Sequence, residues 1–313
     1  MSQSAQNGIE LNVTSSPRSV GSLVLTDVRV EDVPGVALRV WSTPPAGRSL
    51  LHLEQLSVNH TGYNSSTGPA VDLRLRNTDL LMRNCLFSHV TAVDSAVFSL
   101  LLHSDGTATT STAKFTQNSF VSCTGDGVIA ANNTGDATAS LTMTKNSLRH
   151  NSVNDTGSVV QLVNMAVVME DNLFYNNSGR HLLEIGVAAQ CNRLPVRAHR
   201  NVFWSNTALK GAVTCTVSLN ASDVTFTANV FNNPANEYEV SAEETGATRT
   251  GELRVDFAHN WWGSDSPHVV ANRLRDGTTV EGLPVVVSTP FETTPPEGMH
   301  FSSENALSSV LRV

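Results

Sequence analysis

The sequence is poor in charge, in aromatic residues and above all in lysine. Charged residues make up 15% of the 313 residues and aromatic residues 6%, and only three of the 20 basic residues are lysines, at Lys114, Lys145 and Lys210. The formal net charge is 20 − 28 = −8, so the chain lacks the basic face that general nucleic-acid binding requires. Val, Leu and Phe nevertheless recur in strand-like runs, which argues against disorder.

Long apolar runs are also missing. No stretch reaches the roughly 20 consecutive apolar residues that a membrane-spanning helix needs. The opening residues, MSQSAQN, lack the basic and apolar regions of a signal peptide. The sequence therefore predicts neither a membrane span nor a targeting segment within this chain.

Cysteine is scarce and familiar catalytic signatures are absent. The chain has no Gly-x-Ser-x-Gly elbow, no His-Glu-x-x-His and no Gly-rich phosphate loop. Since no Cys-x-x-Cys pair occurs, we predict no dense disulfide framework, no metal site and no cofactor. We interpret Cys215, which alternates with two threonines, as a buried thiol. The four cysteines are Cys85, Cys123, Cys191 and Cys215.

Asparagine is abundant, with 27 residues, and much of it recurs in one short phrase. In most copies the asparagine is followed two residues later by Leu or Phe, as in Asn118-Ser119-Phe120. Two weaker copies, centred on Asp27 and Gln55, precede seven clear ones, and such a count at intervals of 26 to 34 residues marks an internal repeat. The asparagines of the clear copies are Asn84, Asn118, Asn146, Asn172, Asn201, Asn229 and Asn260.

Each period of the repeat holds at least two short strands. Alternating runs such as Leu141–Thr144 and Val224–Thr227 put one face inward, and second runs such as Ser158–Val163 follow a polar turn. Helical periodicity is nearly absent, which excludes helical repeats, and the period is too short for a propeller blade. We therefore predict an all-β parallel β-helix solenoid of about nine rungs over residues 20–264, with the asparagines stacked in a hydrogen-bonded ladder.

The two ends of the chain depart from the repeat. Residues 1–19 read as a polar lead-in, and the lack of an N-terminal cap suggests that the chain was excised from something longer. Ser266, Pro267 and Gly277 are start and stop signals of a short helix. With a strand at Leu283–Val287, this helix makes residues 265–291 a predicted C-terminal cap over the open edge of the last rung. Residues 292–313 are expected to form a flexible tail.

The phrase that closes the repeat array also carries a family resemblance. Asn260-Trp261-Trp262-Gly263, followed by a strand that ends at Pro290-Phe291, resembles the right-handed parallel β-helix repeat group of the pectate-lyase-like superfamily, over roughly residues 20–291. Within that group the chain is similar to ectodomain repeats of animal cell-junction proteins. The resemblance implies a right-handed β-helix and a scaffold role in cell adhesion or junction assembly. Enzymes of the superfamily act on acidic polysaccharides.

Seven Asn-x-Ser/Thr sequons are evidence on whether the protein is extracellular, although some arise by chance in a chain so rich in Asn, Ser and Thr. Together with the low lysine content they favour an extracellular protein, either secreted or the ectodomain of a larger cell-surface protein whose membrane anchor would lie outside this chain. We expect an extracellular protein or glycan as the partner, and no nucleic acid. The predicted glycosylation sites are Asn12, Asn59, Asn64, Asn132, Asn154, Asn176 and Asn220.

Three aspartates are the candidate catalytic residues. Asp94, Asp126 and Asp155 follow their ladder asparagines by 10, 8 and 9 residues, which predicts one corner on three consecutive rungs. Clustered carboxylates could serve a polysaccharide hydrolase or bind a hard cation, whereas aspartate beside Gly or Ser is also ordinary turn chemistry. The sequence thus leaves a carbohydrate-active enzyme, hydrolase or lyase, as the alternative to a noncatalytic module. The lack of a complete catalytic set favours the noncatalytic module.

A second candidate surface is the outward face of the strand that follows each turn. Its predicted row changes from basic to neutral to acidic along the rod, and ordinary solvation explains such a face as well as binding does. Because His181 and Glu184 lie three residues apart, we predict that they point to opposite faces of their strand. The predicted row consists of Arg39, Arg74, Ser99, Ala130, Gln161, Glu184 and Thr214.

Overall fold

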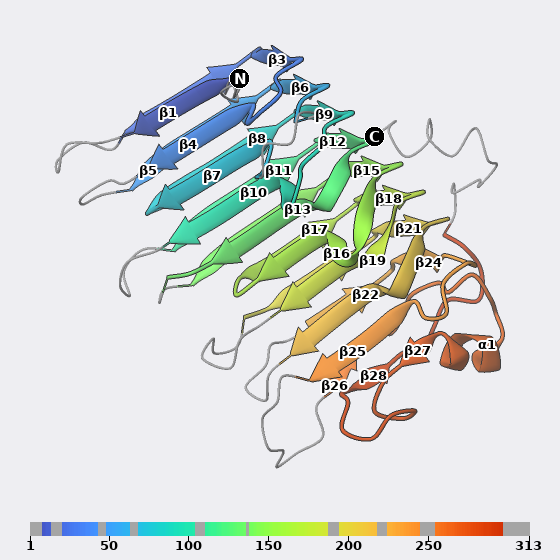
Figure 1. The fold of residues 1–313 in the computed structure, drawn as a ribbon. Coiled ribbons are helices and arrows are strands. Elements are labelled where there is room, and N and C mark those ends of the chain that lie inside the picture. The colour runs from blue at the N-terminus through green and yellow to red at the C-terminus, as the bar shows by residue number, and fades with distance from the viewer. Residues whose placement is uncertain are drawn as a thin grey trace.

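The chain folds into a parallel β-helix of about eight turns (Figure 1). The computed structural model describes residues 8–13, 21–42, 48–62, 68–103, 110–135, 138–186, 194–217, 224–244 and 254–296. Successive turns add one strand to each of three sheets, and the named strands pair in parallel. The all-β solenoid predicted from the repeat is confirmed.

The three sheets run the length of the rod, each with its strands in chain order. The first sheet contains β1 (Ile9–Val13), β4 (Leu38–Ser42), β7 (Val71–Arg76), β10 (Ala96–His103), β13 (Thr124–Asn133), β16 (Ser152–Val163), β19 (Ser178–Gly186), β22 (Thr207–Val217), β25 (Val240–Glu244) and β27 (Leu274–Arg275). The second contains β2 (Ser22–Thr26), β5 (Ser49–Glu54), β8 (Thr78–Arg83), β11 (Ser111–Thr116), β14 (Ala139–Thr144), β17 (Ala166–Glu170), β20 (Val196–His199), β23 (Val224–Thr227), β26 (Arg254–Asp256) and β28 (Val285–Val287). The third contains β3 (Arg29–Glu31), β6 (Ser57–Asn59), β9 (Leu86–Ser88), β12 (Ser119–Val121), β15 (Ser147–Arg149), β18 (Leu173–Tyr175), β21 (Val202–Trp204) and β24 (Val230–Asn232).

Single residues in the left-handed conformation redirect the chain between sheets. The corner from the second to the third sheet has such a residue in all nine copies of the repeat, from Asp27 (φ 55°) to His259 (φ 57°). The corner from the third sheet to the first repeats this at, for example, His89 (φ 52°) and Asn176 (φ 51°). Lys145 and Ala228 occupy corners too, although side chains rarely adopt this backbone. Packing of the turns therefore overrides local preference here.

Inward-pointing apolar side chains of successive turns stack into one continuous core. The central residue of each third-sheet strand faces inward, and the rings of Phe174 and Phe203 stack with centroids 4.6 Å apart. Phe203 then stacks on Phe231 at 5.1 Å, and Phe231 on Trp262 at 4.9 Å. Because a single turn cannot bury its own apolar face, this stacking between turns supplies the core.

The C-terminal end carries the only helix in the described part of the chain, α1 (Pro267–Asn272), which Figure 1 shows at that end of the rod. It begins after Ser266 as predicted, but it ends at Asn272, with Arg273 as its C-cap, rather than at Gly277. We call α1, β27 and β28 the C-terminal cap. Beyond it, the backbone N–H of Glu292, in the segment predicted to be a tail, donates to the carbonyl of Asn260 at 2.9 Å.

The N-terminal end also differs from its predicted role. β1 lies within the predicted lead-in of residues 1–19, yet it pairs in register with β4 from Ile9 to Val13. The first turn therefore starts before residue 20. Its inward side chains, such as Leu11 and Leu23, are only partly buried against the core.

Candidate functional site

Six of the seven predicted ladder asparagines form a hydrogen-bonded ladder inside the rod. At Asn146, the backbone N–H and the side-chain Nδ2 both donate to Oδ1 of Asn172 at 2.9 Å, and Nδ2 also donates to the carbonyl of Phe115 at 2.9 Å. The pattern repeats from turn to turn, so each amide is used by adjacent turns and none faces a ligand. The members are Asn118, Asn146, Asn172, Asn201, Asn229 and Asn260.

Asn84 lies outside this ladder. It is exposed, in the left-handed corner position (φ 54°), and the inward ladder position belongs to the next residue, Cys85. The backbone N–H of Cys85 donates to Oδ1 of Asn118 at 2.9 Å. Asp27 and Gln55, the centres of the two weaker copies, are left-handed corner residues as well. The ladder thus begins at Asn118, and the earlier turns have aliphatic residues or a thiol in its place.

A second ladder, which the sequence reading missed, runs along the corner between the third and first sheets. Here Asn151 donates from its backbone N–H and from Nδ2 to Oδ1 of Asn177, at 3.1 and 2.8 Å. Most of these residues follow a first-ladder asparagine by five positions, a spacing that is visible in the sequence. Its members are Asn151, Asn177, Asn206 and Asn233, and it ends on Glu239.

The described cysteines are buried free thiols. Burial raises the pKa of Cys85 to about 11, and the pKa of Cys123 and of Cys215 to about 12. Thiols in this state are poor nucleophiles and poor metal ligands, because only the thiolate reacts. Cys215 is buried as its alternation with threonines predicted, and Cys191 lies outside the described residues.

The three candidate aspartates have different surroundings. Asp94 is exposed at a left-handed position, and Asp126 accepts a hydrogen bond from Nδ2 of Asn154. Asp155 is exposed in an irregular part of β16, where the register moves from Val153 opposite Gly125 to Ser158 opposite Gly127. β16 thus has three more residues than β13 between these two register pairs, and Asp155 lies in that stretch. In the described ranges, no three His, Cys, Asp or Glu residues are placed to hold a metal ion.

The outer face of the first sheet carries the predicted row, with one member replaced. Asp72, not Arg74, lies beside Arg39 and Ser99, whereas Arg74 lies beside Trp41. Asp72 is nearly buried and forms ion pairs with Nε of Arg39 at 3.6 Å and Nε of Arg74 at 3.3 Å. The basic end of the row is therefore neutralised within the protein. The observed row is Glu10, Arg39, Asp72, Ser99, Ala130, Gln161, Glu184, Thr214, Ser241 and Arg275.

His181 and Glu184 lie on the same outer face, so the prediction that they point to opposite faces is wrong. Leu182 and Leu183 are both completely buried, which shows that the strand bends between them and departs from strict alternation. His181 Nδ1 lies 2.6 Å from Oγ1 of Thr214, the register partner of Glu184. Burial lowers the pKa of His181, with the Glu184 charge opposing the shift.

Glu184 organises polar side chains from the neighbouring turn. Its Oε2 accepts a hydrogen bond from Oγ of Ser158 at 2.6 Å and one from Nε2 of Gln161 at 3.2 Å. Ser158 is buried, Glu184 half-buried and Gln161 exposed. Hydrogen bonding between side chains on a rigid sheet holds the exposed amide in a defined orientation.

A hollow of about 230 Å³ lies beside this cluster, between β10, β13 and β16. Backbone comes close here, because a Cβ on Gly157 would collide with the main-chain oxygen of Asp126. The lining is mostly small or polar: Ala96, Asp126, Gly127, Ala130, Thr156, Gly157, Ser158 and Gln161. We call Asp126, Ser158, Gln161 and Glu184, with this hollow, the polar groove. It offers carboxylate, hydroxyl and amide groups to a ligand.

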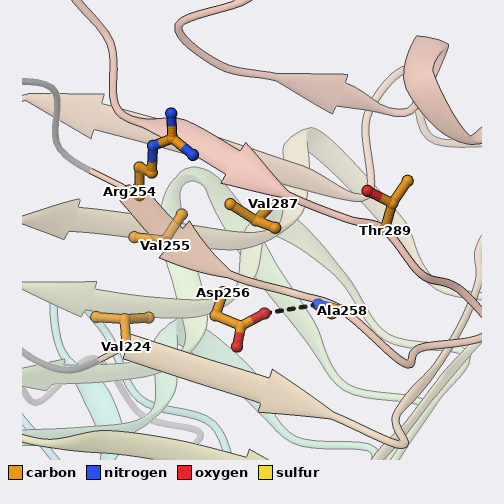
Figure 2. Close-up of a pocket in the computed structure, with 7 residues that line it drawn as sticks. All are labelled: Val224, Arg254, Val255, Asp256, Ala258, Val287 and Thr289. Atoms are coloured by element: carbon orange, nitrogen blue, oxygen red, sulfur yellow. Dashed lines mark hydrogen bonds between the residues drawn. The ribbon is translucent and has the colours of Figure 1, made fainter.

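A second hollow, of about 420 Å³, opens on the second sheet near the C-terminal end (Figure 2). It forms where β23 and β26 share only the register pair Thr225 and Asp256, while β26 and β28 pair over three residues. Asp256 is engaged there by the backbone N–H of Ala258 at 2.9 Å. This hollow contains none of the candidate catalytic or binding residues predicted from the sequence. Its lining is Val224, Arg254, Val255, Asp256, Ala258, Val287 and Thr289.

The predicted glycosylation sites differ in accessibility. Asn12, Asn154 and Asn176 are exposed, whereas Asn59 and Asn132 are half-buried. The Asn154 side chain accepts hydrogen bonds from the backbone N–H of Thr156 at 3.2 Å and from its Oγ1 at 2.9 Å. Asn154 therefore stands at the rim of the polar groove, next to Asp126. Asn64 and Asn220 lie outside the described residues.

Comparisons of the chain with protein-family models, with curated proteins and with solved structures find no match. Among the residues that the structure describes, no helix is long and apolar enough to cross a membrane. The parallel β-helix and the two hollows on its outer faces are therefore the observations on which a function can be argued.

Proposed function

We propose that this chain is a noncatalytic β-helix scaffold that binds a neutral glycan in the polar groove of its first sheet. The observation that carries the proposal is the cluster around Glu184, where Ser158 and Gln161 both donate to one carboxylate oxygen on a rigid sheet. Sugar hydroxyls both donate and accept hydrogen bonds, and the carboxylate, amide and hydroxyl groups of the groove match both roles. Preorganisation of these groups reduces the entropy lost on binding.

The charge of the groove favours neutral over acidic glycans. Asp126 and Glu184 are both carboxylates, and the two arginines of the same row, Arg39 and Arg275, lie near the ends of the rod. Arg39 is paired with Asp72, and Arg275 donates to Oγ of Ser241 at 3.2 Å. An acidic sugar would therefore meet like charge at the two groove carboxylates, which is unfavourable.

We include an extracellular location in the same proposal. The resemblance of the Asn-Trp-Trp-Gly phrase to pectate-lyase-like β-helix repeats, and to the ectodomain repeats of the cell-junction protein bark beetle, supports an extracellular scaffold in adhesion or junction assembly. The three exposed sequons are compatible with that setting. A rigid rod presents its groove at a fixed place along its length, which suits the assembly of a junction.

The test is a binding panel of neutral and acidic oligosaccharides, read by calorimetry with protein secreted from animal cells. We expect a neutral oligosaccharide to bind wild type and to lose at least about tenfold in affinity with Glu184→Gln, since a hydrogen bond to a charged group is worth about 1.5–3 kcal/mol. Gln161→Ala removes hydrogen bonds of a neutral amide, each worth about 0.5–1.5 kcal/mol, and should lose roughly two- to tenfold. Thr142→Ala, on the outer face of the second sheet, serves as the matched control and should bind as wild type does.

Three results would contradict the proposal. The first is a panel without any neutral binder, which would favour a protein partner instead. The second is binding that survives both groove variants. The third is the release of new chain ends from a polysaccharide, abolished by Asp126→Asn or Asp94→Asn. That last result would make the chain a carbohydrate-active enzyme.

A further inference from the structure

The second asparagine ladder ends on a buried carboxylate instead of another asparagine. Asn206 donates from its backbone N–H and Nδ2 to Oδ1 of Asn233, both at 2.8 Å. Asn233 in turn donates from its backbone N–H to Oε1 of Glu239 at 2.8 Å, and from Nδ2 to Oε2 at 2.7 Å. The two carboxylate oxygens thus replace the single amide oxygen of a further ladder asparagine.

Glu239 occupies a position that earlier turns fill with apolar residues. The register of the first sheet aligns it with Ala212, Leu182 and Val159, each completely buried, and Glu239 is completely buried too. Burial raises the pKa of Glu239 to about 7, while the hydrogen bonds from Asn233 and the charge of Arg273 oppose the rise. A carboxyl group is thus placed where its charged form is penalised by burial.

The cap forms one wall of this buried site. The carbonyl of Arg273, the C-cap residue of α1, accepts a hydrogen bond from the backbone N–H of Glu239 at 2.8 Å. Nη1 of Arg273 lies 4.0 Å from Oε1 of Glu239 and donates to the carbonyl of Asn236 at 2.7 Å. Detaching the cap would therefore remove both the main-chain partner and the nearest cation from Glu239.

Arg273 is the only charged side chain that acts on Glu239 among the described residues. On the other sides, β22 contributes Ala212, and the loop before β25 contributes the neutral Asn233 and Asn236. Two other charged groups of the cap are engaged elsewhere. Asp276 accepts a hydrogen bond from the backbone N–H of Val286 at 2.8 Å, and Arg275 donates to Ser241.

We propose that Glu239 couples closure of the C-terminal cap to the binding of one proton, so that the cap opens more readily as the pH rises. In the closed state the buried carboxyl group keeps its proton up to about pH 7. When the cap opens, water reaches Glu239, and the proton leaves for the solvent.

The direction of this pH dependence follows from the thermodynamic linkage between proton binding at Glu239 and closure of the cap. The pKa of Glu239 is raised in the closed state, so its contribution to closure is fully present below its ordinary value, near 4.5, and is lost as the pH rises through about 7. One proton is released for each opening event. The opening equilibrium constant therefore increases by up to about tenfold for each pH unit between about 5 and 7, and it becomes constant at higher pH.

The experiment is site-resolved hydrogen exchange of the whole chain between pH 5 and 8, expressed as protection factors so that the intrinsic pH dependence of exchange is removed. The reporter amides are those of Glu239, which donates to Arg273, and Gly277, which donates to the carbonyl of Pro284 at 2.8 Å. The reference amide is that of Asn172, which donates to Asn201 Oδ1 at 3.0 Å, far from the cap. Variants are Glu239→Gln and, as the matched control on β25, the half-buried Glu243→Gln.

Wild type and Glu243→Gln should lose protection at the reporter amides by about tenfold per pH unit between pH 5 and 7, with the reference amide unchanged. Glu239→Gln should show no such slope, because its amide oxygen accepts the two Asn233 hydrogen bonds without titrating. Equal slopes in Glu239→Gln and wild type would overturn the proposal. So would constant protection in wild type, a result that requires no variant to fold.

Discussion

Interior and outer positions of the same turns follow opposite rules. The inward corner positions repeat one residue along the rod, with Asn118 to Asn260 in the first ladder and Asn151 to Asn233 in the second. The outer row of the first sheet changes at nearly every turn, for example from Ala130 through Gln161 to Glu184. Both sets sit in the same parallel register.

This contrast indicates that interior positions stabilise the fold and that outer positions are available for recognition. Each interior asparagine satisfies backbone and amide groups of adjacent turns, so another residue there leaves buried polar groups without partners. An outer side chain is exposed to solvent, so its polar groups can hydrogen-bond to water and the neighbouring turns do not require one residue type there. The repeated asparagines therefore hold the rod together, and the variable outer row is the reason for placing recognition there.

The largest effect is expected from Asn172→Leu in the middle of the first ladder. The change leaves the backbone N–H of Asn146 and the carbonyl of Met143 without their partners inside the rod. Each unsatisfied buried group costs about 1–3 kcal/mol, so the free energy of unfolding should fall by about 3 kcal/mol or more. Urea unfolding monitored by circular dichroism measures it. A loss below 1 kcal/mol would contradict the structural role of the ladder.

A smaller, stabilising effect is expected from Cys85→Asn. Cys85 already donates its backbone N–H to Asn118 Oδ1 and is nearly completely buried. An asparagine there would extend the ladder by one turn and direct Nδ2 towards the carbonyl of Leu53, now 3.6 Å from Sγ. We expect a gain of about 1 kcal/mol in unfolding free energy. A clear loss would show that this turn cannot accept a ladder residue.

Asn84→Gly should have almost no effect on the free energy of unfolding, although Asn84 belongs to a copy of the asparagine repeat. Its side chain is exposed and its backbone is left-handed (φ 54°), a conformation that glycine adopts freely. The unfolding free energy should stay within about 0.5 kcal/mol of wild type. A loss comparable to that of Asn172→Leu would break the distinction between the corner position and the ladder position.

The least effect on stability is expected on the outer face. Gln161 is exposed and makes its hydrogen bond to Glu184 at the surface. Gln161→Ala should therefore leave the urea midpoint within error of wild type, a change of less than about 0.5 kcal/mol. Destabilisation as large as that of an interior asparagine variant would mean that the outer row also holds the turns together.

The repeat made the architecture predictable from the sequence. Nine copies of one phrase define turns of a solenoid, and alternation within runs such as Val224–Thr227 defines the strands, here β23. The same phrase misplaced the ladder at Asn84, because Asn84-Cys85-Leu86 looks like later copies although its asparagine precedes the inward position. Only the left-handed backbone, which precedes the inward residue in every copy, distinguishes the two positions.

The candidate site was less predictable, because it depends on irregularities of the strands. β16 has three extra residues in the stretch that contains Asp155, and a bend at Leu182 brings His181 to the face of Glu184. Neither irregularity can be recognised from the alternation of apolar and polar residues along the sequence. The pairing of Asp72 with Arg39 likewise depends on the register between β4 and β7. Counting residues from the nearest repeat asparagine did not give this register.

The measurement that tests the functional account most directly is a calorimetric titration of wild type and Gln161→Ala with one neutral oligosaccharide from the panel. The account predicts saturable binding to wild type and roughly two- to tenfold weaker binding to Gln161→Ala, at an unchanged urea midpoint. Equal affinities for the two proteins, or no binding to wild type by any neutral oligosaccharide of the panel, would contradict it.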